Sequence, residues 1–496
     1  MKIAPDLKKQ LLDGLIGLSP NQNAEEIPID KLLPGTILIP NHLNALDPGI
    51  LLVIGGRGAG KTHLFRVFSN DSASRSLSAA PAFAAAIRMI GYATDKQGEP
   101  SYGFPTETSM QSFVSKARDE RTKLMLFWKT LLVAGLYRAG QFEFDWGKAG
   151  LDLELLSSFE NLAEVSQWFE KARPQQERLD TILLQIDADL DREDRYLFVS
   201  YDDLDVIAVE WDEKKELIRS LLQFWYSLWR RSKRIRCKIF LRRDLFSEDF
   251  LQFPDASKFD GHTYELEWTS NQLYQLLLKS WANQSKGCRE FLQGLGIKYG
   301  HDKALGWNFT DISKIDETAI RKVIVSIIGE FMGSGSSKGN TYSWIPNHLQ
   351  DANREIFPRS FLQLFSEAAR QERENPRATD DHLIGYSYFA SALDQVSVRR
   401  LQEIIEEVGW IEAVKPALVG LTVPIERAEM KRAMAKVNLK KDFKGGRPPD
   451  VGPSGLIDLM IKLGLFRQID DGKIHVQDVY LSGFGLKRKG GIRRPK

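Results

Sequence analysis

Residues 51–68 read LLVIGGRGAGKTHLFRVF, an apolar run followed by a glycine-rich loop and the beginning of an amphipathic segment. Residues 55–62 match the P-loop pattern G-x-x-x-x-G-K-[ST] at every fixed position. The apolar run 50–54 predicts a parallel strand buried on both faces, and Leu64 and Phe65 begin the apolar face of a helix. This context favours a phosphate-binding loop over a glycine turn that happens to precede Lys-Thr.

The loop defines a candidate nucleotide site, with ATP and Mg²⁺ as the expected ligands. Its glycines let several backbone N–H groups converge on one phosphate, and the following helix adds its positive end. We expect Lys61 to reach the β- and γ-phosphates, in binding and in catalysis, and the Thr62 hydroxyl to bind Mg²⁺. The candidate nucleotide-binding residues of this segment are Gly55, Gly56, Arg57, Gly58, Ala59, Gly60, Lys61, Thr62 and His63.

A second predicted strand ends in acidic residues. Residues 195–207 read RYLFVSYDDLDVI. Carboxylates at the carboxyl end of a parallel strand lie beside a P-loop, where they can hold Mg²⁺ and its water. We predict that Asp202 binds Mg²⁺ and that Asp203 orients or activates the attacking water. The alternative is an acidic turn at a helix N-terminus, which the accompanying P-loop makes the weaker interpretation.

A third predicted strand, residues 238–246, reads KIFLRRDLF and follows the basic stretch RRSKR. Arg242 or Arg243 at its end is a candidate catalytic residue, because an arginine there stabilises charge on a transferred phosphoryl group. An ordinary ion pair with Asp244 or Asp203 is the alternative. The basic stretch is either an arginine finger for a neighbouring subunit or a solvated helix end.

Length and composition indicate about three domains, because the chain has 496 residues of which 43% are hydrophobic. Together with the family resemblance given below, the sequence predicts an N-terminal segment 1–48, a P-loop ATPase domain 49–265 with a helical insertion at about 95–190, a helical lid 266–396, a winged-helix-like domain 397–486 and a basic tail 487–496. No apolar run is long enough for a membrane span. The two cysteines indicate a reducing compartment, so we expect a cytoplasmic protein without a membrane partner.

The motifs together resemble the STAND and initiator-type branch of the AAA+ ATPases. Residues 264–281, YELEWTSNQLYQLLLKSW, look like the segment that leads from the nucleotide domain of such proteins into a helical lid. Pro358-Arg359, within the segment REIFPRSFLQL, is similar to the lid motif whose arginine senses the nucleotide phosphates. A local cap or ion pair is the other interpretation of Arg359. The segments TYSWIPNH and PRSFL are similar to those of bacterial P-loop ATPases found in phage-defence neighbourhoods.

This resemblance implies an α/β fold, with a P-loop NTPase parallel-sheet domain, an α-helical lid and a C-terminal winged-helix-like domain. It also implies a Mg²⁺-dependent ATPase that assembles into a homo-oligomer and takes part in anti-phage defence. The second acid, Asp203, replaces the common glutamate, so we expect slow turnover.

The C-terminal segment carries the candidate DNA contacts. A helix ended by Gly464 precedes a hairpin around the turn at residues 470–472, and helices followed by a small hairpin resemble a winged helix. The tail cations are Lys487, Arg488, Lys489, Arg493, Arg494 and Lys496. Such a tail neutralises DNA phosphates, solubilises the chain end or docks on an acidic partner.

Two functions follow from these observations. The first is an ATP-driven switch that self-assembles and acts on or near double-stranded DNA. The second is a nucleotide-gated interaction scaffold that regulates a separate effector protein without binding DNA. The sequence contains no recognisable nuclease, protease or deaminase constellation, so any destructive chemistry would belong to another chain.

Overall fold

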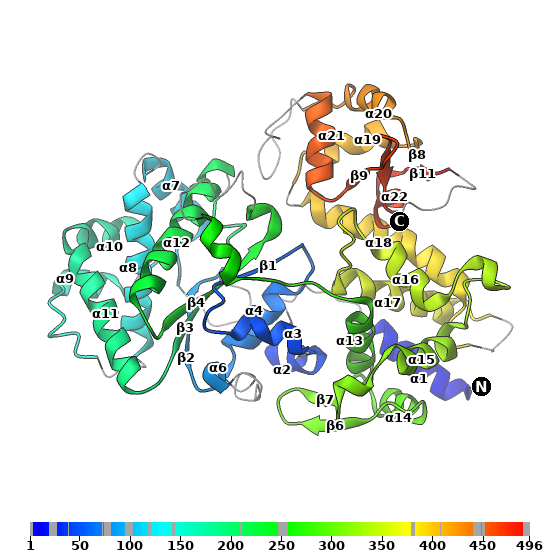
Figure 1. The fold of residues 1–496 in the computed structure, drawn as a ribbon, viewed down its shortest axis with the longest axis horizontal. Coiled ribbons are helices and arrows are strands. Elements are labelled where there is room, and N and C mark those ends of the chain that lie inside the picture. The colour runs from blue at the N-terminus through cyan, green and yellow to red at the C-terminus, as the bar shows by residue number, and fades with distance from the viewer. Residues whose placement is uncertain are drawn as a thin grey trace.

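The structure is a computed structural model. It describes residues 3–18, 27–37, 39–71, 73, 81–94, 103–117, 121–140, 144–208, 211–246, 256–377, 382–406, 408–439, 448 and 452–489. A sheet domain with its helices occupies the left of Figure 1, a helical domain the lower right, and a small domain the upper right.

The sheet domain is built on five parallel strands. They are β1 (Leu52–Gly55), β2 (Ile87–Tyr92), β3 (Leu197–Tyr201), β4 (Ile235–Arg242) and β5 (Thr263–Glu265), in the spatial order β2-β3-β4-β1-β5. Successive residues of β1 pack into different hydrophobic cores, because Leu52 and Ile54 belong to one hydrophobic cluster and Val53 belongs to another. The prediction of a parallel strand buried on both faces is therefore confirmed.

Helices cover both faces of this sheet. α4 (Lys61–Ser69) packs on one face, whereas α8 (Arg121–Ala139) and α12 (Trp211–Arg231) pack against each other and against β2 and β4 on the other. The indole N–H of Trp128 in α8 donates to the Leu217 carbonyl of α12 at 3.1 Å. Other helices in the described part of this domain are α6 (Pro81–Ala84), α7 (Glu107–Ala117), α9 (Leu153–Ser158), α10 (Val165–Ala172) and α11 (Gln176–Arg192). Figure 1 shows α7 to α11 at the outer end, as the predicted helical insertion requires.

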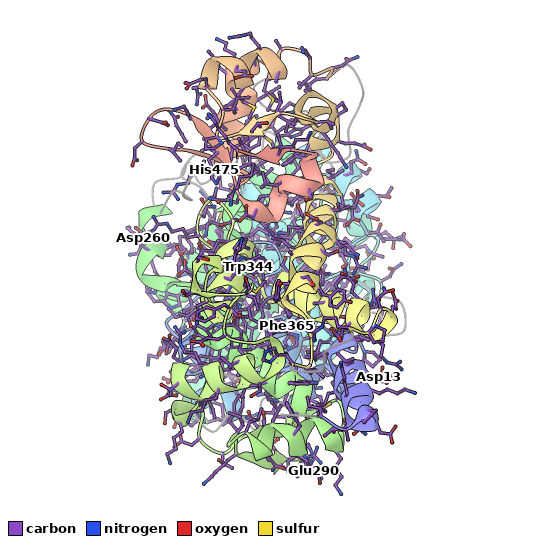
Figure 2. All side chains as sticks on the ribbon, turned by 90° about the vertical axis from the view of Figure 1, so that its right-hand side faces the viewer. Asp13, Asp260, Glu290, Trp344, Phe365 and His475 are labelled. Atoms are coloured by element: carbon purple, nitrogen blue, oxygen red, sulfur yellow. The ribbon has the colours of Figure 1, made fainter. Side chains whose placement is uncertain are left out.

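The lid domain shares its core with the N-terminal helix. Its elements are α13 (Ser270–Ala282), α14 (Lys286–Gly294), β6 (Tyr299–Asp302), β7 (Gly306–Phe309), α15 (Glu317–Ile328), α16 (Thr341–Leu349) and α17 (Pro358–Glu374). α1 (Pro5–Ile16) packs on α17 and α14. The indole N–H of Trp281 donates to the Leu11 carbonyl at 3.1 Å, and Lys8 pairs with the buried Glu372 carboxylate at 3.1 Å. Figure 2 shows Asp13 of α1 at the flank of the lid that contains Phe365.

The prediction of a separate N-terminal segment 1–48 is therefore wrong. α1 is part of the lid, and the next two helices, α2 (Ile29–Leu32) and α3 (Pro40–Leu43), lie beside the P-loop domain. Leu32 and Leu46 belong to the same hydrophobic cluster as α4. α1 lies apart from α2 and α3, although the three are close in sequence, because α1 packs on the lid whereas α2 and α3 pack beside the P-loop domain.

The small domain is joined to the lid by one continuous helix, α18 (Tyr386–Ile405), which packs on both α17 and α22. The predicted boundary between residues 396 and 397 falls inside this helix and is wrong. The domain continues with α19 (Ile411–Leu418), β8 (Thr422–Val423), α20 (Arg427–Met434), α21 (Pro453–Lys462), β9 (Phe466–Gln468), β10 (Ile474–Val476) and α22 (Asp478–Phe484). β9 and β10 form an antiparallel hairpin, so the predicted winged-helix-like order of helices and hairpin is present. His475 of this hairpin lies in the upper part of the molecule in Figure 2, with other elements of the small domain above it.

The beginning of the predicted basic tail is folded. β11 (Lys487–Arg488) pairs in parallel with β8, and Arg488 forms an ion pair with Asp478 at 2.7 Å. The prediction of a basic tail over residues 487–496 is therefore wrong for Lys487 and Arg488, because their backbone pairs with β8 in the small domain. Arg493, Arg494 and Lys496 lie outside the described residues.

No helix within the described ranges is both long and apolar enough to cross a bilayer.

Gly483 tests the contact between α18 and α22. A Cβ added at Gly483 would lie 2.7 Å from the Ser397 carbonyl oxygen, so Gly483→Ala must push the two helices apart and should lower the free energy of unfolding by about 1–3 kcal/mol. Gly294→Ala is the matched control, because a Cβ there has no atom within 4 Å. Urea unfolding of both variants measures the effect, and equal stability of the two would contradict the tight α18–α22 contact.

Candidate nucleotide-binding site

The P-loop follows the strand, loop and helix order that the sequence predicts. β1 ends at Gly55 and α4 begins at Lys61. Gly58 and Gly60 have φ angles of 81° and 102°, a conformation that L side chains rarely adopt. The loop therefore curls at Gly58 and Gly60 and leads into the N-terminus of α4, where free backbone N–H groups favour an anion.

Two side chains hold the loop in shape. The Lys61 ammonium donates to the carbonyl oxygens of Gly55 and Gly56, both at 3.0 Å. The indole N–H of Trp268, which follows β5, donates to the Ala59 carbonyl at 2.7 Å. These bonds place the lysine head at the mouth of the loop and connect the loop to the segment that leads into the lid.

The acidic pair lies at the carboxyl end of β3, as predicted. Asp202 is buried, whereas Asp203 has a φ of 58°, so the chain turns sharply out of the strand at this residue. Thr94, just after β2, donates to the Asp203 carboxylate from its hydroxyl at 2.6 Å and from its backbone N–H at 3.3 Å. The neighbouring strand end therefore fixes the orientation of Asp203, and both acids line the cleft that contains the P-loop.

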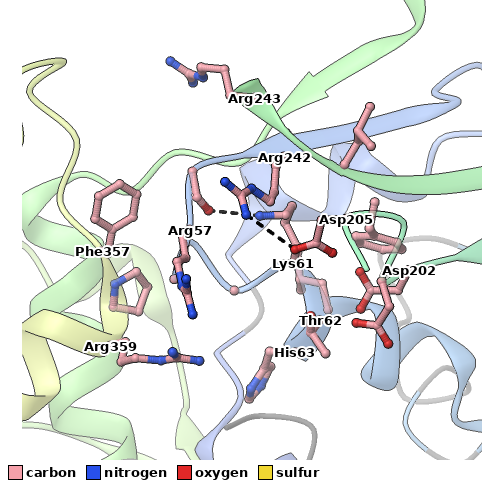
Figure 3. A pocket seen from close by; sticks show the side chains of 18 of the residues that line it. Arg57, Lys61, Thr62, His63, Asp202, Asp205, Arg242, Arg243, Phe357 and Arg359 are labelled. Atoms are coloured by element: carbon pink, nitrogen blue, oxygen red, sulfur yellow. Dashed lines mark hydrogen bonds and ion pairs between the residues drawn. The ribbon is translucent and has the colours of Figure 1, made fainter. Parts of the chain in front are cut away.

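The two candidate arginines at the end of β4 have different surroundings. Arg242, the last residue of the strand, pairs with Asp205 at 3.5 Å. Arg243 lies in the next turn and pairs with Glu265 at 2.8 Å and with Glu355 of the lid at 2.6 Å. Figure 3 shows Arg242 extending toward Lys61, whereas Arg243 points away from it. Arg242 thus faces the phosphate-binding region, and Arg243 joins the sheet domain to the lid.

The lid packs directly on the P-loop. A Cβ at Gly56 would lie 2.5 Å from the Phe357 ring and 2.8 Å from the Glu355 carboxylate, so only glycine permits this approach. Pro358 begins α17, and Arg359 in its first turn extends toward the loop in Figure 3. The predicted lid helix is therefore present, with its arginine at the cleft.

Carboxylates of α18 and of the residue that follows it face the arginines of the loop and the lid. Glu403 pairs with Arg359 at 3.4 Å, and Glu406 pairs with Arg57 at 3.5 Å. Burial lowers the pKa of Arg57 to about 10; Glu403 opposes the shift, while Arg242, Arg400 and Arg359 add to it. The cleft therefore concentrates positive charge around the P-loop and balances it with carboxylates from a distant helix.

His63 lies on the side of the cleft that the N-terminal segment lines. Its Nε2 atom is 2.6 Å from the Thr36 hydroxyl. Burial, with smaller contributions from Arg66 and Lys279, lowers its pKa to about 4, so the ring is neutral near pH 7.

One cleft of about 2110 Å³ gathers most of the predicted site residues. Its lining includes Gly56, Arg57, Gly58, Gly60, Lys61, Thr62, His63, Asp202, Asp203, Arg242, Arg243 and Arg359. Lys487, Arg488 and Lys489 lie in the small domain and do not line this cleft. Within the basic stretch before β4, Arg231 pairs with Asp180 and Arg234 with Asp191 of α11, which supports the interpretation as a helix end.

Residues that were not predicted from the sequence include Thr94 and Arg400, which line the cleft, and Glu403, which pairs with Arg359 and Arg400 beside it. Thr94 lies just beyond an apolar strand, which is a position that the strand pattern could have flagged. Arg400 and Glu403 lie within a long helix, and nothing in the local sequence connects them to a loop near the other end of the chain.

No protein-family model matches this chain, and no curated protein matches it. Among solved structures, it is similar to Aeropyrum pernix ORC2 with ADPNP and ADP, at 14% identity and a TM-score of 0.37, over 88% of this chain and 87% of that one. It is also similar to Aeropyrum pernix ORC1 in complex with DNA, at 13% identity and a TM-score of 0.35, over 91% and 94% of the two chains. The interpretation of the site rests on the loop, the sheet order and the cleft of this chain.

Lys61→Ala should abolish tight ATP binding without unfolding the protein. The change removes charge-assisted phosphate contacts from a partly exposed side chain, and it creates no cavity in a core. Titration with ATP and a thermal melt measure the two effects. Lys286→Ala, which removes an exposed lysine from the lid surface, should leave both unchanged. ATP affinity equal to that of the unmodified protein in Lys61→Ala would contradict the assignment of the loop.

Proposed function

We propose that this protein is an ATP-binding and hydrolysing molecular switch of the AAA+/STAND-like type. The observation that carries the proposal is a complete P-loop after β1, with the acidic end of β3 in the same cleft. The lid closes against this loop through Phe357 and presents Arg359 to it. A cleft bounded by two domains with cations from both responds to a bound polyanion by changing how the domains pack.

The residues fit a Mg²⁺ ion that arrives with its nucleotide. Thr62 and Asp202 both line the cleft and offer the oxygen ligands that Mg²⁺ prefers. Over the described part of the chain, no group of three or more His, Cys, Asp or Glu residues forms a metal site of its own. Phosphate oxygens and water would therefore complete the coordination, and the ion would polarise the γ-phosphate.

The chain's own groups supply the remaining parts of the hydrolytic step. Lys61 and the loop N–H groups bind the phosphates, and Arg242 extends toward Lys61 where negative charge would develop. Asp203, whose carboxylate is fixed by Thr94, is the candidate for accepting the proton of the attacking water. An aspartate side chain is one methylene shorter than glutamate, so we expect slow turnover.

Asp203→Asn should keep ATP bound but slow hydrolysis at least ~tenfold, because an amide does not accept the proton of the water. Single-turnover hydrolysis together with an ATP titration separates the two effects. Asp202→Asn is the paired variant, and its hydrolysis rate should depend mainly on the Mg²⁺ concentration. If Asp202→Asn slows hydrolysis while Asp203→Asn does not, the two roles are reversed.

We further propose that the protein self-assembles and acts on or near double-stranded DNA, in the anti-phage setting that the sequence resemblance implies. Its small domain has the winged-helix order of elements. Lys431 and Arg432 on α20 and Lys436 after it are exposed, and among the described residues none of the three has an ion-pair partner. Unpaired surface cations of this kind are suited to phosphate contacts.

The salt dependence of DNA affinity tests this part. We expect replacement of Lys431, Arg432 and Lys436 by Gln, or truncation after Lys489, to weaken duplex binding. The slope of log affinity against log salt should fall by roughly 0.9 for each DNA phosphate that the variant no longer neutralises. Truncation at that position leaves β11 and its pairing with β8 in place. Unchanged affinity and slope in both proteins would contradict DNA binding by either surface.

The nucleotide-gated scaffold is the second candidate function, and one observation favours it. Leu459, Lys462 and Leu463 at the end of α21 line the same cleft as the P-loop, although α21 is the helix before the hairpin. The end of α21 is thus turned toward the nucleotide cleft, next to residues 351–353 of the lid. A DNA-independent ATPase that co-purifies with a separate effector protein would support the scaffold.

A further inference from the structure

Two arginines of different helices share one carboxylate at the P-loop. Glu403 accepts from Arg359 of α17 at 3.4 Å and from Arg400 of its own helix α18 at 3.3 Å. Both bonds are long for charge-assisted contacts. Glu403 is therefore shared between two guanidinium groups, and Tyr480 and Asp351 also act on Arg400.

Arg400 is built into the cleft. Its side chain is 4% exposed, and its guanidinium lies 4.2 Å from the centre of the Phe357 ring. Among the described residues, its Nε atom has no hydrogen-bond partner. A planar cation stacked on an aromatic ring keeps its edge available for in-plane hydrogen bonds.

The Nη1 atom that donates to Glu403 also lies at the P-loop. A Cβ placed on Gly58 would be 3.4 Å from an Nη atom of Arg400, nearer than the 3.8 Å to the Cβ of Arg359. Gly58 belongs to the loop whose N–H groups surround a phosphate. Arg400 thus approaches the phosphate-binding loop at least as closely as the lid arginine that the sequence suggests.

On this basis, and resting on the proposed function, we propose that Arg400 of α18 is a nucleotide phosphate ligand that Glu403 holds until nucleotide binds. A bound triphosphate carries more negative charge than one carboxylate and offers several acceptor oxygens in this partly buried cleft. It therefore replaces Glu403 as the partner of Arg359 and Arg400. Glu403 acts as an internal competitor of the nucleotide.

The same exchange connects the nucleotide with the small domain. α18 is continuous from the lid into that domain, and its Ser397 accepts from the backbone N–H of Gly483 in α22 at 2.9 Å. Movement of Arg400 and Glu403 relative to the P-loop therefore moves a helix that packs tightly on α22.

The test is an ATP titration of the full chain, with Mg²⁺, for the unmodified protein and three variants. Arg400→Ala should weaken ATP binding about tenfold or more, because it removes a buried charge-assisted contact. Arg399→Ala is the matched control, since the adjacent residue is exposed and its loss changes the net charge equally. Glu403→Gln should tighten ATP binding several-fold, because the internal competitor loses its charge. A merely structural role of the Arg400–Glu403 pair does not produce tighter binding.

Each outcome supports or overturns the proposal. ATP binding by Arg400→Ala within twofold of Arg399→Ala, or weaker binding by Glu403→Gln, overturns it. If Arg400→Ala does not fold, Glu403→Gln and Arg400→Lys decide, and Arg400→Lys should bind ATP more weakly than the unmodified protein because an ammonium lacks the planar fork. Failure of the unmodified protein to bind ATP instead contradicts the proposed function itself, so the two failures are distinguishable.

Discussion

The contact between the P-loop and the lid is the constraint on which the rest of the structure depends. Gly56 allows the Phe357 ring to approach the loop backbone, and this approach brings Arg359 and Arg400 to the loop. Arginines of the P-loop, β4, α17 and α18 then lie close together in a partly buried cleft, where cations without counter-charges would repel one another. Glu403, Glu406 and Asp205 stabilise this arrangement. The fold thus forms a site suited to an anion, and the chain's own carboxylates pair with part of it.

The same arrangement links the cleft to the small domain through a chain of contacts. Trp268 connects the loop to the beginning of the lid, and Glu355 connects the lid to the end of β4. α18 extends the lid into the small domain, with which it forms one hydrophobic core. A change of partner at Glu403 therefore alters contacts in all three parts at once. Such a device suits a switch, because the stability of the closed state depends on the anion that occupies the cleft.

Local sequence patterns were sufficient for the core of the site. The glycines and the Lys61-Thr62 pair specify the loop, the apolar run ending at Asp202 specifies β3, and Pro358 specifies the start of α17. The hairpin of the small domain likewise follows from its turn residues and flanking apolar pairs. In each case the residues that predict the element lie within one short segment of the chain.

The remaining features depend on contacts between distant segments. α1 has an apolar face that would suit several partners, and only the tertiary fold assigns it to the lid. Lys487 and Arg488 read as a charged tail, whereas pairing with β8 makes them a strand. Arg400 and Glu403 look like ordinary helix-surface charges until α18 is placed against the P-loop. Helical periodicity describes a face but does not say what that face meets.

Hydrogen–deuterium exchange of the full chain with and without Mg²⁺-ATP tests the central claim most directly. The account predicts slower exchange in the P-loop and the start of α4, together with a change of exchange in α18 around Arg400 and Glu403. Exchange that remains the same in the P-loop would contradict nucleotide binding at this site. Protection of the P-loop without any change in α18 would contradict the coupling between the nucleotide and the small domain.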